Sequence, residues 1–355
     1  MGRFRPGGEP EIELRIALDA TYAVGGELSG IGVFSRALIE ALAEAFPDDI
    51  LLLAFRPHRF LRSFTWRTPP NSRRRLLFEN VRVGGAEVFH GLNQRLPSAR
   101  YRCTVSTFHD LFVLTGEYST PEFRARFARQ ARDAAGRSDR IIAVSRFTAR
   151  QVRDLLGVEE SRIRVVPHGV RLPERVPRRR RPMVLHVGAI QARKNLVRLV
   201  RAFQVLPPEW RLVLAGGRGY GAERVFETIA SSPARDRIDT PGYVSRARLE
   251  QLYATAGLLA FPSLDEGFGI PVLEAMAWGL PVLTSNRSAL PEVGGEAVWY
   301  VDPLDEDELA DGLSRLAGDP GLRERLSRRG RERAAQFRWE DSARAVAAVY
   351  REAAG

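Results

Sequence analysis

Hydrophobic and polar residues follow one rhythm through most of the chain: a short apolar run, a loop, and then an amphipathic segment. The apolar runs are rich in Val, Ile and Leu, which is typical of parallel strands that helices cover on both faces. The first clear amphipathic helix spans residues 32–46. In the first half of the chain we expect strands within residues 14–20, 50–55, 87–91, 103–110 and 140–145.

The alternation of apolar runs and amphipathic segments is interrupted once and then resumes. Residues 173–182 are rich in proline and arginine and have no hydrophobic period, which indicates a linker. We interpret its arginine run, Arg178–Arg181, as a solvated hinge rather than a binding patch. Beyond the linker we expect strands within residues 182–189, 211–217, 257–263, 280–285 and 297–302.

This pattern predicts an α/β protein with two Rossmann-like, doubly wound parallel-sheet domains that face a central cleft. Ligands of such sheets bind beyond the carboxyl ends of the strands, so the chemistry is expected in those loops. The last helix could lie on either domain, and a return to the N-terminal domain stays open. The expected boundaries are 1–172 for the N-terminal domain, 173–182 for the linker, 183–337 for the C-terminal domain and 338–355 for the C-terminal helix.

Length and composition fit two domains and narrow the class of protein. The 355 residues can form two cores, and the single cysteine, Cys103, excludes an internal disulfide. No apolar run has the length of a signal peptide or a membrane span, so we expect a cytoplasmic protein. The net charge of +11 favours an anionic partner. We do not expect that partner to be nucleic acid, because the basic residues are dispersed and no reading motif occurs.

One lysine, Lys194, stands among 54 basic residues that are otherwise all arginine. With Arg193 it follows an expected strand and precedes an apolar helical stripe. Backbone N–H groups and the helix dipole favour an anion at such a turn, and they disfavour a cation unless an anionic ligand lies between them. A lysine is also a compact, rotatable charge that suits a phosphate. The context therefore favours a phosphate site over chance survival of one lysine.

A second stretch, residues 261–285, combines a strand end, a glycine-containing loop and a helix. Gly267 and Gly269 let the loop backbone approach a ligand, and Glu266 and Glu274 could both point toward the cleft. For an arbitrary pair of glutamates the better interpretation would be that Glu274 complements the helix dipole and Glu266 is solvated.

The segment "EGFGIPVLE" resembles the signature of glycosyltransferase family 4, whose members are retaining enzymes with the GT-B fold. The segments "GAIQARKNL", "TFHDLFVL", "IAVSRFTA", "VVPHGV" and "SNRSALPEVGG" resemble other family segments in the expected order. The resemblance thus covers nearly the whole chain. It implies an N-terminal domain for the acceptor and a C-terminal domain for a nucleotide-sugar donor.

The resemblance also implies roles for individual residues. Lys194 and Arg193 would hold the donor diphosphate and stabilise the leaving group, where negative charge develops. Glu266 would contact sugar hydroxyls, and His109 would lie beside the transferred sugar. The remaining donor-binding residues would be Glu274 at the ribose, the backbone of Gly267, Phe268 and Gly269, the strand-end Gly188, and Gly30 and Gly32 in a flexible glycine loop.

One departure concerns the strand-end glycine, because many family members have an arginine directly after it and here Ala189 follows Gly188. The resemblance to family members that also lack this arginine favours a mannosyltransferase that uses GDP-mannose. We therefore expect a retaining transferase that moves a hexose, mannose first, to a saccharide or a lipid-linked glycan. The alternatives are a glucosyltransferase that uses UDP-glucose or ADP-glucose, and a non-catalytic nucleotide-sugar-binding protein on the same fold.

No cofactor and no metal are expected. Asp305 and Asp307 fit an Asp-x-Asp metal pattern, but they open a helical segment, which favours an acidic N-terminal cap. The glycines between Gly216 and Glu223 lack the spacing of a dinucleotide-binding fingerprint, so an NAD-dependent oxidoreductase is disfavoured.

Basic and aromatic residues alternate within residues 55–67, for example Arg62, Phe64 and Trp66. Such a stretch could lie on an anionic bilayer, which would suit a lipid-linked acceptor. A surface loop with partly buried aromatics is an equally good interpretation. Peripheral contact with the inner face of the cell membrane is therefore left open.

Overall fold

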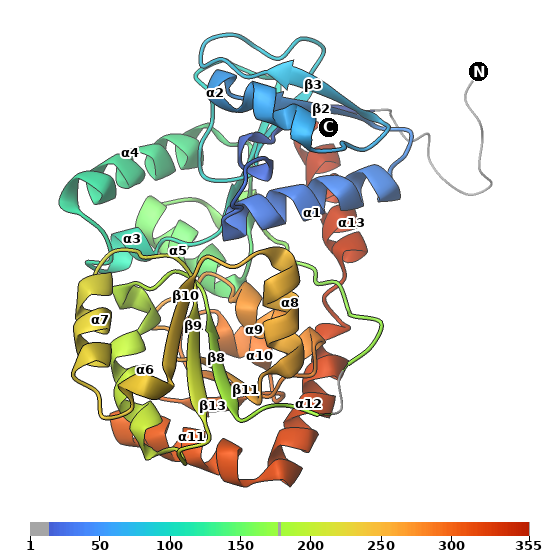
Figure 1. The fold of residues 1–355 in the computed structure, drawn as a ribbon. Helices are drawn as coiled ribbons and strands as arrows, with labels where there is room; N and C mark the ends of the chain where they lie inside the picture. Colours follow the sequence, from blue (N-terminus) through green and yellow to red (C-terminus); the bar gives the residue numbers. More distant parts are fainter. Residues whose placement is uncertain (1–13, 177–178, 355) are drawn as a thin grey trace.

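The computed structural model describes residues 14–176 and 179–354, which form two parallel sheets (Figure 1). The predicted segments 1–172, 173–182 and 338–355 include residues 1–13, 177–178 and 355, which lie outside the described residues; Arg178 of the predicted hinge is one of them. In the described parts of the chain, no helix is both long and apolar enough to cross a bilayer.

The N-terminal sheet has the strand order β3-β2-β1-β4-β5-β6-β7, with parallel pairing throughout. The order reverses between β1 and β4, and in sheets of this kind the ligand site lies at such a point. The strands are β1 (Arg15–Asp19), β2 (Ile50–Phe55), β3 (Ser72–Leu76), β4 (Val88–Gly91), β5 (Cys103–Phe108), β6 (Arg140–Ala143) and β7 (Ile163–Val165).

The C-terminal sheet has the order β10-β9-β8-β11-β12-β13 and is also parallel. Its order reverses between β8 and β11, so the loops after these two strands are the expected place of a ligand. Those loops carry Lys194 and Glu266 respectively. The strands are β8 (Met183–Val187), β9 (Arg211–Ala215), β10 (Ile238–Gly242), β11 (Leu258–Phe261), β12 (Val282–Ser285) and β13 (Trp299–Val301).

The ten predicted strands are present, and three further strands, β3, β7 and β10, lie at sheet edges. The sequence of β3, "SRRRL", and that of β10, "IDTPG", have no apolar run. An edge strand has a neighbour on one side only and can carry polar residues, which also protect the edge. Hydrophobic patterning therefore cannot find these strands.

Helices cover both faces of each sheet, as the alternating pattern predicts. In the N-terminal domain one face packs against α1 (Gly30–Ala45) and the other against α4 (Pro121–Arg137) and α5 (Arg146–Leu156). In the C-terminal domain α8, α9 and α10 cover one face, while α6, α7 and α11 cover the other. The remaining bounds are α2 (Pro57–Phe60), α3 (Phe112–Thr115), α6 (Leu196–Ala202), α7 (Ala222–Ala230), α8 (Arg246–Thr255), α9 (Ile270–Ala277), α10 (Leu290–Gly294), α11 (Glu306–Gly318) and α12 (Pro320–Ala334).

The last helix, α13 (Trp339–Ala354), lies beside α1 on the N-terminal domain (Figure 1). Its buried Val346 and Tyr350 belong to the same apolar core as the α1 residues. The Tyr350 hydroxyl lies 2.6 Å from Nδ1 of the buried His90 on β4. The end of the chain thus completes the core of the domain that the start of the chain builds.

The arginine run of the predicted linker differs from a solvated hinge in one respect. Arg179 and Arg181 are exposed, but Arg180 is half-buried, and its guanidinium donates to the carbonyl oxygens of Tyr253 at 2.9 Å and Trp278 at 2.6 Å. Arginine carries five N–H donors in a fixed fork, so one side chain can hold several carbonyls. The hinge interpretation is therefore wrong for Arg180, which fastens the incoming chain to the C-terminal domain.

Candidate active site

The loop after β8 brings two basic side chains to the carboxyl end of the C-terminal sheet. Gly188 follows the strand with a φ of +138°, and a side chain there would lie 3.5 Å from Cε of Lys194. Arg193 and Lys194 end a single 3-10 turn, Ala192–Lys194, directly before α6. Each of the two residues is only 6% exposed. The structure thus has both cations at a strand-to-helix turn, where the sequence pattern puts them.

One carboxylate oxygen meets both cations. Lys194 Nζ lies 2.5 Å from Glu266 Oε1, and Arg193 Nη1 lies 2.8 Å from the same atom. The Ser263 hydroxyl donates a further hydrogen bond to this oxygen at 2.5 Å. The sequence suggested an external anion as the partner of Lys194, whereas in the structure the Glu266 side chain fills that place.

The protonation states follow from burial and from this shared pairing. Burial alone would raise the pKa of Glu266, but the charges of Arg193 and Lys194 outweigh it and lower that pKa to about 2. Burial, assisted by the charge of Arg193, lowers the pKa of Lys194 to about 8. At neutral pH Glu266 is therefore ionised, and most of Lys194 is still cationic.

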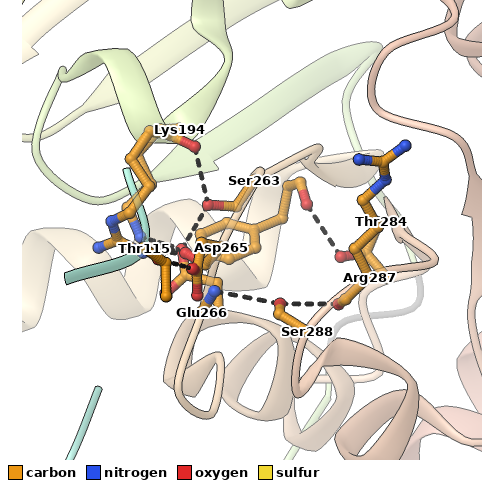
Figure 2. A network of polar contacts seen from close by, with 10 residues as sticks. Thr115, Lys194, Ser263, Asp265, Glu266, Thr284, Arg287 and Ser288 are labelled. Carbon is orange, nitrogen blue, oxygen red and sulfur yellow. Dashed lines mark hydrogen bonds and ion pairs between the residues drawn. The ribbon is translucent and has the colours of Figure 1, made fainter. Parts of the chain in front are cut away.

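A network of polar contacts holds the Glu266 loop in place (Figure 2). The backbone N–H of Glu266 donates to Ser288 Oγ at 3.1 Å, and its carbonyl accepts from the Ala289 N–H at 3.2 Å. On the other side, the carbonyl of Arg193 accepts from the Leu264 N–H at 2.9 Å. The loop after β11 is thereby fixed between the loop after β8 and the segment that leads into α10.

The N-terminal domain touches this cluster from across the domain boundary. The Arg193 guanidinium lies over the Phe112 ring at 4.2 Å, and Thr115 Oγ1 donates to Asp265 Oδ2 at 2.8 Å. A Cβ on Gly267 would lie 1.7 Å from the carbonyl oxygen of His109, so only glycine permits this approach. The two domains therefore meet at residues that the sequence singled out, Arg193, Gly267 and His109, and at others that it did not, Phe112, Thr115 and Asp265.

His109 is buried with its ring turned into the N-terminal domain. Its Nε2 lies 2.9 Å from the carbonyl oxygen of Leu92, and its ring stacks on that of His168 at 5.5 Å. Burial lowers the pKa of His109 to about 4, so the ring is neutral at physiological pH. Because a carbonyl only accepts, the neutral ring carries its proton on Nε2.

The neighbouring Asp110 also faces the cluster. Burial raises the pKa of Asp110 to about 6, although the charge of Arg193 opposes this shift. Part of Asp110 is thus protonated near neutral pH. In the sequence, the position next to His109 is the feature that points to Asp110 as a site residue. An aspartate after a strand is too common for that feature to predict a function.

Glu274 forms a separate set of contacts on the first turns of α9. Its Oε1 accepts from Arg246 at 2.6 Å, and its Oε2 accepts from the Tyr253 hydroxyl at 3.0 Å. Both partners belong to α8, which sequence reasoning did not connect with the site. The carboxylate is thus oriented from two sides, while Glu266 takes its partners from the loops after β8 and β11.

The other predicted glycines and Phe268 have clear local surroundings. Gly269 is the N-cap residue of α9 and has a φ of +98°, and Phe268 packs edge-on against His168 with ring centroids 4.6 Å apart. Gly30 and Gly32 lie in the first turn of α1 rather than in a loop. A Cβ on Gly32 would lie 2.5 Å from the Tyr22 carbonyl oxygen, which gives this glycine a packing reason of its own.

The acidic Asp-x-Asp pattern is a helix cap. Asp305 precedes α11, and its Oδ1 accepts from the Glu308 N–H at 3.0 Å, as an N-cap residue does. Within the described ranges, no group of three or more His, Cys, Asp or Glu side chains is arranged to hold a metal ion. The capping interpretation of Asp305 is confirmed.

Two family models match the chain in succession. The model described as Glycosyltransferase Family 4 matches residues 29–173, and the model described as Glycosyl transferases group 1 matches residues 173–333. The solved structure of sucrose-phosphate synthase from Thermosynechococcus elongatus superposes with a TM-score of 0.76 at 24% identity, covering 96% of this chain and 98% of that one. The family models therefore identify a glycosyltransferase, and the superposition shows that it has the GT-B fold.

Curated relatives narrow this class further. The O-antigen chain mannosyltransferase B of Escherichia coli is 32% identical over 273 residues, which are 72% of this chain and 71% of that protein. A D-inositol 3-phosphate glycosyltransferase of Xylanimonas cellulosilytica is 34% identical over 242 residues, which are 61% of this chain and 57% of that protein. The chain belongs to glycosyltransferase family 4 and is similar to mannosyltransferases.

Proposed function

We propose that the protein is a retaining mannosyltransferase that moves mannose from GDP-mannose to a saccharide or a lipid-linked glycan. The observation that carries this proposal is the buried cluster of Arg193, Lys194 and Glu266 at the switch point of the C-terminal sheet. Similarity to an O-antigen chain mannosyltransferase supports mannose as the sugar. The glycan acceptor is proposed on the same ground.

Lys194 and Arg193 would bind the donor diphosphate and stabilise it as the leaving group. Both cations share one oxygen of Glu266, so each can exchange that contact for a phosphate oxygen without leaving a cation unpaired. Nε of Arg193 is buried and lacks a hydrogen-bond partner among the described residues, so one further donor is available. Charge on the leaving oxygen grows in the transition state, which is where these cations act most strongly.

The other site residues would position the two substrates. Once Lys194 and Arg193 bind the diphosphate, Glu266 would accept hydrogen bonds from sugar hydroxyls. Glu274 would accept hydrogen bonds from the ribose hydroxyls. His109 is neutral and would lie beside the transferred sugar. No side chain need act as nucleophile, because the leaving diphosphate oxygen can take the proton of the acceptor hydroxyl on the same face of the sugar.

A thermal-shift panel tests the donor. GDP-mannose, UDP-glucose, ADP-glucose and NAD would each be added in excess, because a ligand that binds only the folded state raises the melting temperature. We expect the largest rise with GDP-mannose and none with NAD. A rise confined to UDP-glucose or ADP-glucose would instead identify a glucosyltransferase and would refute the choice of mannose.

We propose further that the reaction needs no divalent metal, because Arg193 and Lys194 neutralise the diphosphate charge that a metal ion would otherwise neutralise. Activity in the presence of excess EDTA should equal activity in buffer with added Mg²⁺. Loss of turnover in EDTA that Mg²⁺ restores would contradict this part of the proposal.

We propose, lastly, that a lipid-linked acceptor is reached at an anionic membrane surface through residues 57–65. Leu61 is 81% exposed and Phe64 is 63% exposed, next to Arg59 and Arg62. The segment is not one amphipathic helix, since α2 has four residues and a 3-10 turn (Leu61–Thr65) follows it. The aromatic rings of Phe55 and Trp66 are buried and serve the core.

Liposome cosedimentation tests this contact. We expect the protein to sediment with vesicles that contain phosphatidylglycerol and to stay in solution with pure phosphatidylcholine. The double variant L61S/F64S should lose sedimentation and stay folded, because both side chains are mostly exposed and, among the described residues, the ring contacts of Phe64 are limited to the Phe60 ring and the Arg74 guanidinium. Equal sedimentation of the variant and the wild type would remove this role from the segment.

A further inference from the structure

Helix α5 of the N-terminal domain begins at the domain boundary, and a carboxylate from the other domain caps it. Oε2 of Glu292, on α10, accepts from the Arg146 N–H at 2.8 Å, and Oε1 accepts from the Phe147 N–H at 2.6 Å. The first N–H groups of a helix have no partner within the helix, and the helix dipole favours an anion there. Glu292 therefore makes two charge-assisted hydrogen bonds across the boundary.

The helix's own cap residue is also turned toward the other domain. Ser145 Oγ accepts from the Thr148 N–H at 3.0 Å and donates to the carbonyl oxygen of Gly267 at 2.7 Å. Thr148 Oγ1 donates to the same carbonyl at 3.0 Å. Two buried hydroxyls thus donate to one backbone oxygen of the loop that carries Glu266.

The segment that carries Glu292 is joined to that same loop. The Glu266 N–H donates to the Ser288 hydroxyl, and the Glu266 carbonyl accepts from the Ala289 N–H, directly before α10. From the other side, the Arg333 guanidinium donates to the carbonyl of Glu292 at 2.7 Å. Movement of Glu292 relative to α5 would therefore displace the Glu266 loop relative to the N-terminal domain.

We propose that Glu292 is a positioning residue that closes the two domains by capping α5 across the boundary. It acts through the Glu266 loop, which it holds against His109 and Phe112. Without the Glu292 carboxylate, the Arg146 and Phe147 N–H groups can bind water only when the two domains separate. The conformational equilibrium therefore shifts toward separated domains. Glu292 then controls turnover and domain separation but takes no part in holding the nucleotide.

The test compares E292A and the isosteric E292Q with the control E296Q. Glu296 follows the same helix and is exposed. Small-angle scattering of the protein without ligand measures separation of the domains independently of the donor's identity. We expect a larger radius of gyration for E292A and E292Q than for the wild type, with an unchanged value for E296Q. Circular dichroism confirms that each variant is folded.

Kinetics and nucleotide binding separate positioning from general destabilisation. With the donor that the thermal-shift panel identifies, kcat/KM of E292A should fall about tenfold or more, because the loss of even one of its two charge-assisted hydrogen bonds has an effect of that size. The affinities for GDP and UDP, measured by calorimetry, should stay within about twofold, because Lys194, Arg193 and Glu274, which we propose to hold the nucleotide, all belong to the C-terminal domain. T148V removes the hydrogen bond that Thr148 donates to the Gly267 carbonyl, so it should also increase the radius of gyration.

Three results would overturn the proposal. One is a radius of gyration of folded E292A and T148V equal to that of the wild type. Another is a loss of GDP and UDP affinity in parallel with kcat/KM. The third is an effect of E296Q as large as that of E292Q.

Discussion

At the scale of single residues, Lys194 shows why one ammonium can persist among arginines. It shares one oxygen of Glu266 with Arg193, and its Nζ also lies 4.6 Å from the centre of the Phe261 ring. A second planar guanidinium would need room for its fork in a place where a compact charge suffices. The position therefore requires the shape of lysine as well as its charge.

Replacing Lys194 with alanine should lower kcat far more than it weakens donor binding. A preorganised group that meets charge developing in the transition state contributes about 100-fold or more to kcat. Initial rates over a range of donor concentrations separate kcat from KM. Equal losses in kcat and in donor affinity would mean that Lys194 contributes uniform binding instead.

The pH dependence follows from the lowered pKa of Lys194. The cation is the active form, so kcat/KM should fall as the pH rises through about 8, where free enzyme loses this proton. K194R should be slower but should lack this alkaline limb, because a guanidinium keeps its proton throughout. A pH profile of K194R that coincides in shape with that of the wild type would assign the limb to another group.

Residue patterns anticipated part of the site and missed the rest for physical reasons. Lys194, Glu266 and Gly267 belong to one loop pair and carry a recognisable signature. Thr115 and Glu292 act on the site from segments far away in the sequence, and their side chains have no local pattern that reveals a distant partner. Even the pairing of Lys194 with Glu266 needed the folded chain, since 72 positions separate them.

At the scale of elements, Gly267 lies where the backbones of the two domains approach each other closely. G267A should lower kcat about 100-fold, because a displacement near 1 Å at a catalytic loop has effects of that size. The added Cβ would lie 1.7 Å from the His109 carbonyl oxygen, and a backbone atom cannot move away locally. Initial rates and melting curves give activity and folding separately.

Gly136 supplies the matched control for this substitution. It lies within α4, and a Cβ there would meet no atom within 4 Å. G136A should therefore keep full activity and gain about 0.5–1 kcal/mol of stability from the better helix propensity of alanine. Full activity of G267A would show that the loop can retreat without consequence.

Helix α13 gives a second prediction at this scale. Val346 is 1% exposed in the N-terminal core, so V346A should lower the free energy of unfolding of that domain by about 2 kcal/mol. R344A, on the exposed side of the same helix, should change it by about 0.5 kcal/mol or less. Urea denaturation measures both. Unchanged stability of V346A would mean that α13 does not support the domain.

Hydrophobic patterning predicts the buried strands but not the position of every helix. The buried strands appear as apolar runs because helices cover both faces of the sheets. The position of α13 could not be read in the same way. Its apolar stripe fits any apolar surface, and the choice between the two domains depends on contacts with α1 and His90, which are made only in the folded chain.

At the scale of the whole molecule, two sheets bring their carboxyl-end loops together, and the cluster of Arg193, Lys194 and Glu266 lies where they meet. A structure of the protein with bound GDP-mannose tests the central claim most directly. The account predicts the diphosphate within hydrogen-bond distance of Lys194 Nζ, with Glu266 turned to the sugar. A diphosphate bound elsewhere, with the ion pair of Lys194 and Glu266 intact, would contradict it.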